Sequence, residues 1–296
     1  MLSRLKTERQ NRASADLDKL SALEVVSLMN RQDAHVVRAV HRALPAIAKA
    51  VDLIQTHLAQ GGRLIYVGSG TSGRIGALDA SECPPTFGTD PKTIQYMIAG
   101  GERALTQASE ASEDSREGGV HDMAARRPGK KDVVVGLAAS GRTPYTVAAL
   151  QYAAKKGAAT VAIICNEGSE LAEVAQVAIE AEVGPEILAG STRLKAGTAE
   201  KLICNMLTTG AMARLGYVYG NLMVNLNTSN EKLNERGISI VQRVAKVSWE
   251  EAETTLKKAD MKVAVALVML RAKVSKREAQ RRLRLSQGNV RKAMGS

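Results

Sequence analysis

The stretch Gly68-Ser69-Gly70-Thr71-Ser72-Gly73-Arg74 decides the fold of this chain. It directly follows an apolar run at residues 63–67, which predicts a buried strand, and it precedes residues 75–82, which predict a helix. A strand, a turn of glycines and hydroxyls, and a helix start together form a ready anion site, because the first N–H groups of a helix have no intrahelical acceptor. Three hydroxyl side chains in the turn are therefore candidate phosphate ligands: Ser69, Thr71 and Ser72.

Two common phosphate-binding motifs fit this loop less well. It lacks the Gly-Lys-Ser/Thr ending of a Walker A loop. Gly68, Gly70 and Gly73 do satisfy Gly-x-Gly-x-x-Gly, but the dinucleotide fingerprint also needs an acid at the end of the next strand. The next strand signal, at residues 93–98, ends in Ala99-Gly100-Gly101 instead. The loop thus favours a sugar phosphate, and the alternative is an ordinary turn with an N-cap serine.

A second loop of the same kind follows another predicted strand, at residues 132–136. Its Ser140-Gly141-Arg142 echoes the Ser-Gly-Arg of the first loop, and a helix is expected at residues 145–156. Thr143 is a natural N-cap, and Pro144 stands where proline suits a helix start. Ligands bind beyond the carboxyl ends of parallel strands, so both loops are expected to form one site. The second loop contributes three candidate substrate ligands: Ser140, Arg142 and Thr143.

Strand signals alternate with helix signals through the middle of the chain, which predicts an α/β fold with a doubly wound parallel sheet flanked by helices. The predicted strands are residues 63–67, 93–98, 132–136, 159–165 and 177–183. Residues 14–59 read as helical with a kink or break at Pro45, and residues 250–296 read as short helices broken near Val274-Ser275 and Gly288. We expect an N-terminal helical segment (1–50), a sugar-phosphate-binding catalytic domain (51–236) and a small C-terminal helical subdomain (237–296).

Composition narrows the class of protein. Aromatic residues make up only 3 % of the 296 residues, which argues against a base-stacking nucleic-acid platform. The four histidines and three cysteines have no metal-ligand spacing, so neither a metal nor a cofactor is expected. No membrane span or signal peptide is predicted, and the odd cysteine count suggests a reducing, cytoplasmic compartment. The net charge of +11 gathers in the tail from Arg271 onward, which suits an anionic ligand or partner without proving either.

Two acidic spots could supply catalysis. Glu82 stands before Cys83-Pro84-Pro85, where we expect the helix to end, and a carboxylate in the last turn has its pKa raised by the helix dipole. Glu82 would then be a general acid, and a solvated helix-end glutamate is the alternative. Glu113 lies in the acidic run at residues 110–117, which is a solvated face unless one carboxylate turns toward Ser72.

Three further motifs follow in order along the chain, namely Asp79-Ala80-Ser81-Glu82-Cys83-Pro84-Pro85, Glu113-Asp114-Ser115 and Gly184-Pro185-Glu186-Ile187-Leu188-Ala189-Gly190-Ser191-Thr192-Arg193-Leu194-Lys195-Ala196-Gly197-Thr198-Ala199. Together with the two loops they resemble the N-acetylmuramic acid 6-phosphate etherases of the sugar isomerase (SIS) superfamily. The resemblance runs over nearly the whole chain. It implies the flavodoxin-like SIS fold.

The resemblance also implies a cytoplasmic, homodimeric, cofactor-free bacterial lyase of peptidoglycan recycling. Such enzymes remove D-lactate from N-acetylmuramic acid 6-phosphate and give N-acetylglucosamine 6-phosphate. The family's acid matches Glu82 and its second catalytic glutamate matches Glu113. The reaction is an elimination followed by hydration, in which one carboxylate removes the C2 proton while the acid protonates the leaving lactyl oxygen.

Two rival functions stay open from the sequence. Sugar isomerase domains also occur in regulators with DNA-binding helices, and the pattern of residues 277–294 is similar to a helix-turn-helix. We favour a small packing subdomain for these residues, and nucleic acid is not expected as a partner. An aldose–ketose phosphosugar isomerase could share the fold, and only the two glutamate motifs and residues 184–199 argue against it. The alanine-rich residues 46–58 and 198–214 are expected to build the dimer interface.

Overall fold

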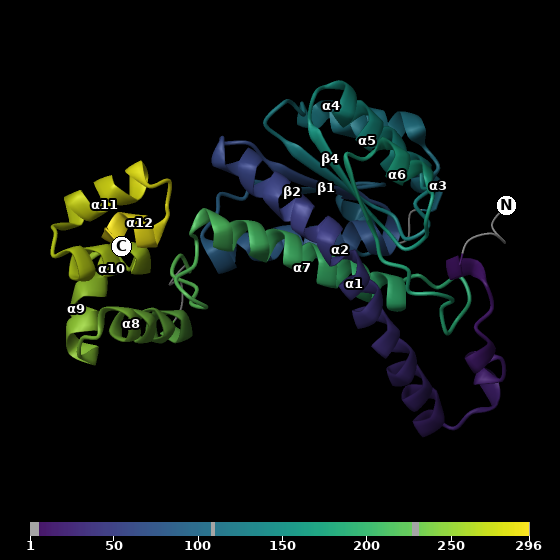
Figure 1. The fold of residues 1–296 in the computed structure, drawn as a ribbon, viewed down its shortest axis with the longest axis horizontal. Coiled ribbons are helices and arrows are strands. Elements are labelled where there is room, and N and C mark those ends of the chain that lie inside the picture. Colours follow the sequence, from purple (N-terminus) through teal and green to yellow (C-terminus); the bar gives the residue numbers. More distant parts are fainter. Residues whose placement is uncertain (1–5, 108–109, 227–230, 296) are drawn as a thin grey trace. The chain divides into compact units, whose positions relative to one another are not determined.

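The computed structural model describes residues 6–107, 110–226 and 231–295 (Figure 1). Its centre is a sheet of five parallel strands in the order β2-β1-β3-β4-β5. All five predicted strands are present, with bounds that differ from the prediction by at most three residues. They are β1 (Leu64–Gly68), β2 (Ile94–Ile98), β3 (Val133–Leu137), β4 (Ala159–Ile164) and β5 (Val177–Glu180).

Helices cover both faces of the sheet, which confirms the doubly wound fold. Strands β1, β3 and β4 are buried along their whole length, as expected for apolar runs covered on two sides. Figure 1 shows α4 (Arg116–Arg126), α5 (Pro144–Lys155) and α6 (Glu170–Val174) on one face, and α1 (Ala22–Ala59) on the other. The strand order is that of flavodoxin, whose direction of winding reverses between β1 and β3.

The chain divides into two compact units, Met1–Ala80 with Lys92–Thr208, and Ser81–Pro91 with Thr209–Ser296. These bounds differ from the boundaries we expected at residues 50 and 236. The first expected boundary falls inside α1, a single 38-residue helix that begins at a Ser21 capping box. The helix also continues through Pro45, so the expected break there is wrong. Pro45 is exposed, and the buried neighbours Ala43 and Ile47 hold the helix in place.

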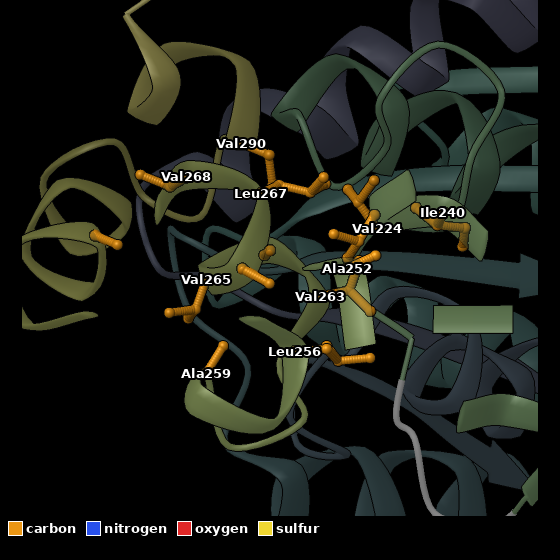
Figure 2. Packing of buried hydrophobic residues seen from close by; sticks show 14 of the residues in the cluster. Val224, Ile240, Ala252, Leu256, Ala259, Val263, Val265, Leu267, Val268 and Val290 are labelled. Atoms are coloured by element: carbon orange, nitrogen blue, oxygen red, sulfur yellow. The ribbon is translucent and has the colours of Figure 1, made fainter. Parts of the chain in front are cut away.

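The second unit is a helical subdomain with its own apolar core (Figure 2). Its helices are α8 (Glu231–Ala245), α9 (Trp249–Lys258), α10 (Val263–Ala272), α11 (Lys276–Leu285) and α12 (Val290–Met294). The expected breaks near Val274-Ser275 and Gly288 are confirmed by the ends of these helices. Leu267 on α10 and Val290 on α12 are both fully buried, so the basic tail contributes to this core. No helix in the described part of the chain is both long and apolar enough to cross a bilayer.

Candidate functional site

The two predicted loops begin side by side at the carboxyl edge of the sheet. Gly68, the last residue of β1, pairs in register with Leu137, the last residue of β3, and with Ile98 at the end of β2. The loops that follow β1 and β3 therefore leave the sheet at the same level, on either side of the point where the winding reverses. Ligands of doubly wound sheets bind at this point.

The first loop turns directly from β1 into α2 (Gly70–Phe87), and glycine is required at two positions of the turn. A Cβ atom on Gly68 would lie 2.8 Å from the backbone nitrogen of Gly73, and one on Gly73 would lie 2.6 Å from Cγ1 of Ile98. Gly70 is different. It has a φ of 52°, and a Cβ atom there would meet no atom within 4 Å. The start of α2 therefore has open space in front of it, which suits an anion at the helix N-terminus.

The hydroxyls of this loop differ in what they contact. Ser69 is buried, and its Oγ has no hydrogen-bond partner in the described structure. Ser72 is also buried, and its Oγ donates to Oε1 of Glu200 at 2.8 Å. Thr71 is half-buried. Buried hydroxyls are nearly always paired, so the Ser69 hydroxyl is available to a hydrogen-bond partner from outside the protein.

The second loop is held by its own backbone and by a neighbouring turn. Ser140 is half-buried, and its Oγ accepts the backbone N–H of Arg142 at 3.2 Å. Gly141 has a φ of 68°, and a Cβ atom there would lie 2.2 Å from Oγ of Ser169. Thr143 takes the N-cap position of α5 and Pro144 the first helical position, as predicted. The Thr143 side chain makes no capping hydrogen bond, however, and the Arg142 side chain is exposed.

Glu113 ends the short helix α3 (Glu110–Glu113) in the same unit as both loops. Helix α3 packs against α5, the helix that begins directly after the second loop. Glu113 is half-buried. The next helix, α4, is capped by Ser115, whose hydroxyl accepts the N–H of Gly118 at 2.9 Å and so fixes the chain just after Glu113.

Helix α2 extends well beyond the bounds predicted for it, and this changes the argument about Glu82. The helix ends at Phe87 rather than at Glu82, because it continues through Pro84 and Pro85. Gly88, with a φ of 66°, closes it by donating its N–H to the carbonyl of Pro84 at 2.8 Å. Glu82 is exposed and lies five residues before the helix ends, so it does not stand in the last turn, where we expected it.

Glu200, on α7 (Lys195–Leu215), was not predicted as a site residue. Its side chain is only 1 % exposed, and burial raises its pKa to about 8 although the Ser72 hydrogen bond opposes this. The signal for it was present, because buried residues of α7 recur at helical spacing on either side, from Ala196 to Ile203 and Cys204. A glutamate inside such an apolar stripe is a charged group in the core.

A second buried carboxylate fixes α2 behind the first loop. Asp79 accepts the hydroxyl of Tyr66 on β1 at 2.9 Å and, from α7, the amide of Asn205 at 2.7 Å and the hydroxyl of Thr208 at 3.3 Å. Burial raises its pKa. One side chain thus ties β1, α2 and α7 together, so that the first loop starts from a rigid base.

Comparison with known families gives three matches along the chain. The glucokinase regulatory protein N-terminal SIS domain matches residues 46–154, the SIS domain matches residues 109–209, and the C-terminal lid domain of glucokinase regulatory protein matches residues 220–263. Among solved structures, a phosphoheptose isomerase from Francisella tularensis superposes with a TM-score of 0.49 and 17 % identity over 64 % of this chain and all of that one.

The curated relatives are much more similar. N-acetylmuramic acid 6-phosphate etherases from Clostridium beijerinckii and Geobacillus thermodenitrificans are each 48 % identical over 99 % of this chain, which covers 96 % and 100 % of their lengths. The etherase of Escherichia coli O127:H6 is also 48 % identical, over 99 % of this chain and 98 % of its own. The similarity therefore includes both loops, both glutamate motifs and the C-terminal helices, and the chain belongs to the N-acetylmuramic acid 6-phosphate etherase family.

Proposed function

We propose that this protein cleaves the lactyl ether of N-acetylmuramic acid 6-phosphate and releases D-lactate and N-acetylglucosamine 6-phosphate. It would act as a carbon–oxygen lyase in the cytoplasm, in the recycling of peptidoglycan sugars. One observation carries the proposal: two hydroxyl-rich loops meet at the winding reversal of an SIS sheet in a chain that is 48 % identical, over 99 % of its length, to proteins named for this reaction.

The chemistry needs one acid and one base. In the open-chain sugar the C2 proton lies beside the aldehyde, which acidifies it. We assign Glu113 as the base that removes this proton and Glu82 as the acid that protonates the leaving lactyl oxygen. Water then adds to the double bond at C3. Both assignments rest on the family resemblance, since Glu82 is exposed on α2 and Glu113 is half-buried on α3.

Incubation with N-acetylmuramic acid 6-phosphate tests the function directly, with D-lactate measured by an enzymatic assay. An aldose–ketose isomerase would instead give a ketose phosphate and no lactate. A DNA-binding regulator would show a sequence-specific gel shift that outlasts the steep salt loss of non-specific binding. The burial of Ala279, Val290 and Met294 in the core of the C-terminal unit supports a packing role for the tail.

We expect the phosphate to lie over the first turn of α2, with Ser69 and Ser72 as donors and Ser140, Arg142, Thr71 and Thr143 around it. Ser72→Ala should raise KM by an amount equivalent to about 1–3 kcal/mol, roughly 5- to 150-fold, with a smaller change in kcat. Ser69→Ala should raise KM without lowering the melting temperature, because its hydroxyl has no partner to lose in the free protein. An unchanged KM in Ser69→Ala, Ser72→Ala and Ser140→Ala would rule this phosphate site out.

We propose a homodimer whose interface includes residues 23–44 of α1. Four large apolar side chains there are exposed, from Leu44 at 39 % to Leu23 at 74 %, with Val26 and Val37 between them. At 3.6 residues per turn all four lie on one side of the helix. Residues 46–58 and 198–214, which we also expected at the interface, stay predictions, and residues 46–58 could contribute only the face that does not pack Ile47, Ala50 and Ile54 inside the protomer.

Val37→Asp should convert the dimer to monomers in multi-angle light scattering at micromolar concentration. Val37 is 65 % exposed, so the substitution should leave the protomer folded. His35→Asp is the matched control, because His35 is exposed on the opposite side of the same helix. A wild-type protein that is already monomeric contradicts the proposal, as does a Val37→Asp variant that stays dimeric.

A further inference from the structure

The contact between Ser72 and Glu200 has a consequence for phosphate binding, given the function proposed above. A serine hydroxyl carries a single proton and two lone pairs. Its oxygen lies 2.8 Å from Oε1 of Glu200, so the two groups share one hydrogen bond whose donor depends on the protonation state of Glu200. While Glu200 is ionised it can only accept, so Ser72 gives it the proton and turns lone pairs toward a phosphate. A protonated Glu200 can donate instead, which frees the Ser72 proton.

We propose that Glu200, in its protonated form, is a positioning residue that donates to Ser72 Oγ and thereby turns the Ser72 hydroxyl into a donor for the substrate phosphate. The proposal rests on the phosphate site described above. Its geometric basis is the close packing of α7 on the first turn of α2, where a Cβ atom on Gly197 would lie 3.4 Å from Cγ2 of Thr71. The Glu200 carboxyl group therefore contacts Ser72 of the first loop directly, without a water molecule between the two side chains.

The surroundings of Glu200 favour its protonated form at neutral pH. Burial raises its pKa to about 8, and the hydrogen bond from Ser72 is the opposing influence. Two thiols interact electrostatically with Glu200, and one of them, Cys165, also interacts with the buried carboxyl group of Glu186. Cys165 follows β4 and Cys204 lies on α7, and burial raises the pKa of both well above the ordinary value, so both stay neutral through pH 9. Asp79, which lies on α2, acts electrostatically on Cys204 and also raises the pKa of that thiol.

An ionised Glu200 would weaken phosphate binding in two ways. It withdraws the Ser72 proton, and it places a buried negative charge one hydrogen bond away from the loop that holds the phosphate. Affinity for a sugar phosphate should therefore fall above pH 8, by up to about tenfold per pH unit for one linked proton. The phosphate itself does not produce this change, because the second pKa of a phosphate monoester is about 6.

The test is calorimetric titration with N-acetylglucosamine 6-phosphate between pH 6.5 and 9.5, in buffers of different ionisation enthalpy. The wild-type protein should take up about one proton on binding near pH 8–9, and its affinity should fall as the pH rises further. Glu200→Gln keeps the shape and always donates through its amide, so its affinity should be independent of pH and no proton should be taken up. Cys204→Ala is the control, which should retain the wild-type pH dependence.

Three outcomes overturn the inference. The first is a wild-type affinity that stays constant between pH 7 and 9.5, and the second is a Glu200→Gln variant that keeps the loss. Both leave the proposed function intact if lactate is released from N-acetylmuramic acid 6-phosphate. The third is a wild-type protein that binds no sugar phosphate at any pH and releases no lactate, in which case the proposed function has failed as well. If Glu200→Gln does not fold, the wild-type measurement can still overturn the inference, because a constant affinity between pH 7 and 9.5 excludes the proposed proton linkage.

Discussion

Glu82→Gln should slow the release of D-lactate by about 10²–10⁴-fold, the usual contribution of general acid catalysis. The amide keeps the size of the side chain but cannot give a proton to the departing lactyl oxygen. Glu82 is exposed in the free protein, so the substitution should change neither the melting temperature nor KM for the substrate greatly. The loss should therefore be seen in kcat.

The same variant should still exchange the C2 hydrogen of the substrate with solvent, because Glu113 remains. Deuterium incorporation at C2 in heavy water, measured beside lactate release, separates the two steps. Glu250→Gln is the matched control, since it makes the same chemical change at an exposed glutamate of the same compact unit and should leave both rates unchanged. Lactate release near the wild-type rate in Glu82→Gln would mean that another group is the acid.

Deuterium exchange is needed because the structural reason for calling Glu82 the acid has disappeared. Glu82 was expected in the last turn of a helix that ends there, because proline disfavours a helical conformation in the residue before it. In the structure the buried side chains of Cys83 and Phe87 hold the final turn in place, and tertiary packing offsets the two hydrogen bonds that Pro84 and Pro85 cannot make. A rule for local conformation could not foresee this, because the compensating contacts come from other parts of the chain.

The sheet and its two loops were predictable for the opposite reason. Each strand is a short apolar run between turn residues. Such a run is typical of a parallel strand that is buried on both faces, as Val133–Leu137 is. The order of the strands comes from the structure, and the register places Gly68 beside Leu137. The loops that carry Ser69 and Ser140 therefore lie at adjacent strand ends, as the sequence predicted.

Glu200 was not found because its importance depends on a contact between residues 128 positions apart in sequence. Sequence motifs identify side chains that contact the substrate. Glu200 contacts Ser72 instead, and Ser72 is the predicted phosphate ligand. Ser72 was identified as a phosphate ligand without its partner. The partner decides whether the Ser72 proton is available, so the sequence identifies the side chain but not the direction of its hydrogen bond.

Glu113→Gln should slow both C2 exchange and lactate release by about 10²–10⁴-fold or more. Both rates fall because removal of the C2 proton precedes loss of the lactyl group. Glu113 lies on α3 in the same compact unit as both loops, and α3 packs against α5, which begins directly after Ser140, Arg142 and Thr143. We therefore expect Glu113 to act on a sugar whose phosphate is held by the loops.

The measurement compares Glu113→Gln with Glu117→Gln, an exposed glutamate one helix further on, which should retain both rates. If Glu113→Gln keeps C2 exchange while Glu82→Gln loses it, the two glutamates have the opposite roles. If Glu113→Gln releases lactate at the wild-type rate, the base is a different residue. A loss of both rates in Glu113→Gln, with both rates kept in Glu117→Gln, would show that α3 supplies the base. The loops at the end of the SIS sheet would then hold the phosphate, while α3 performs the first chemical step.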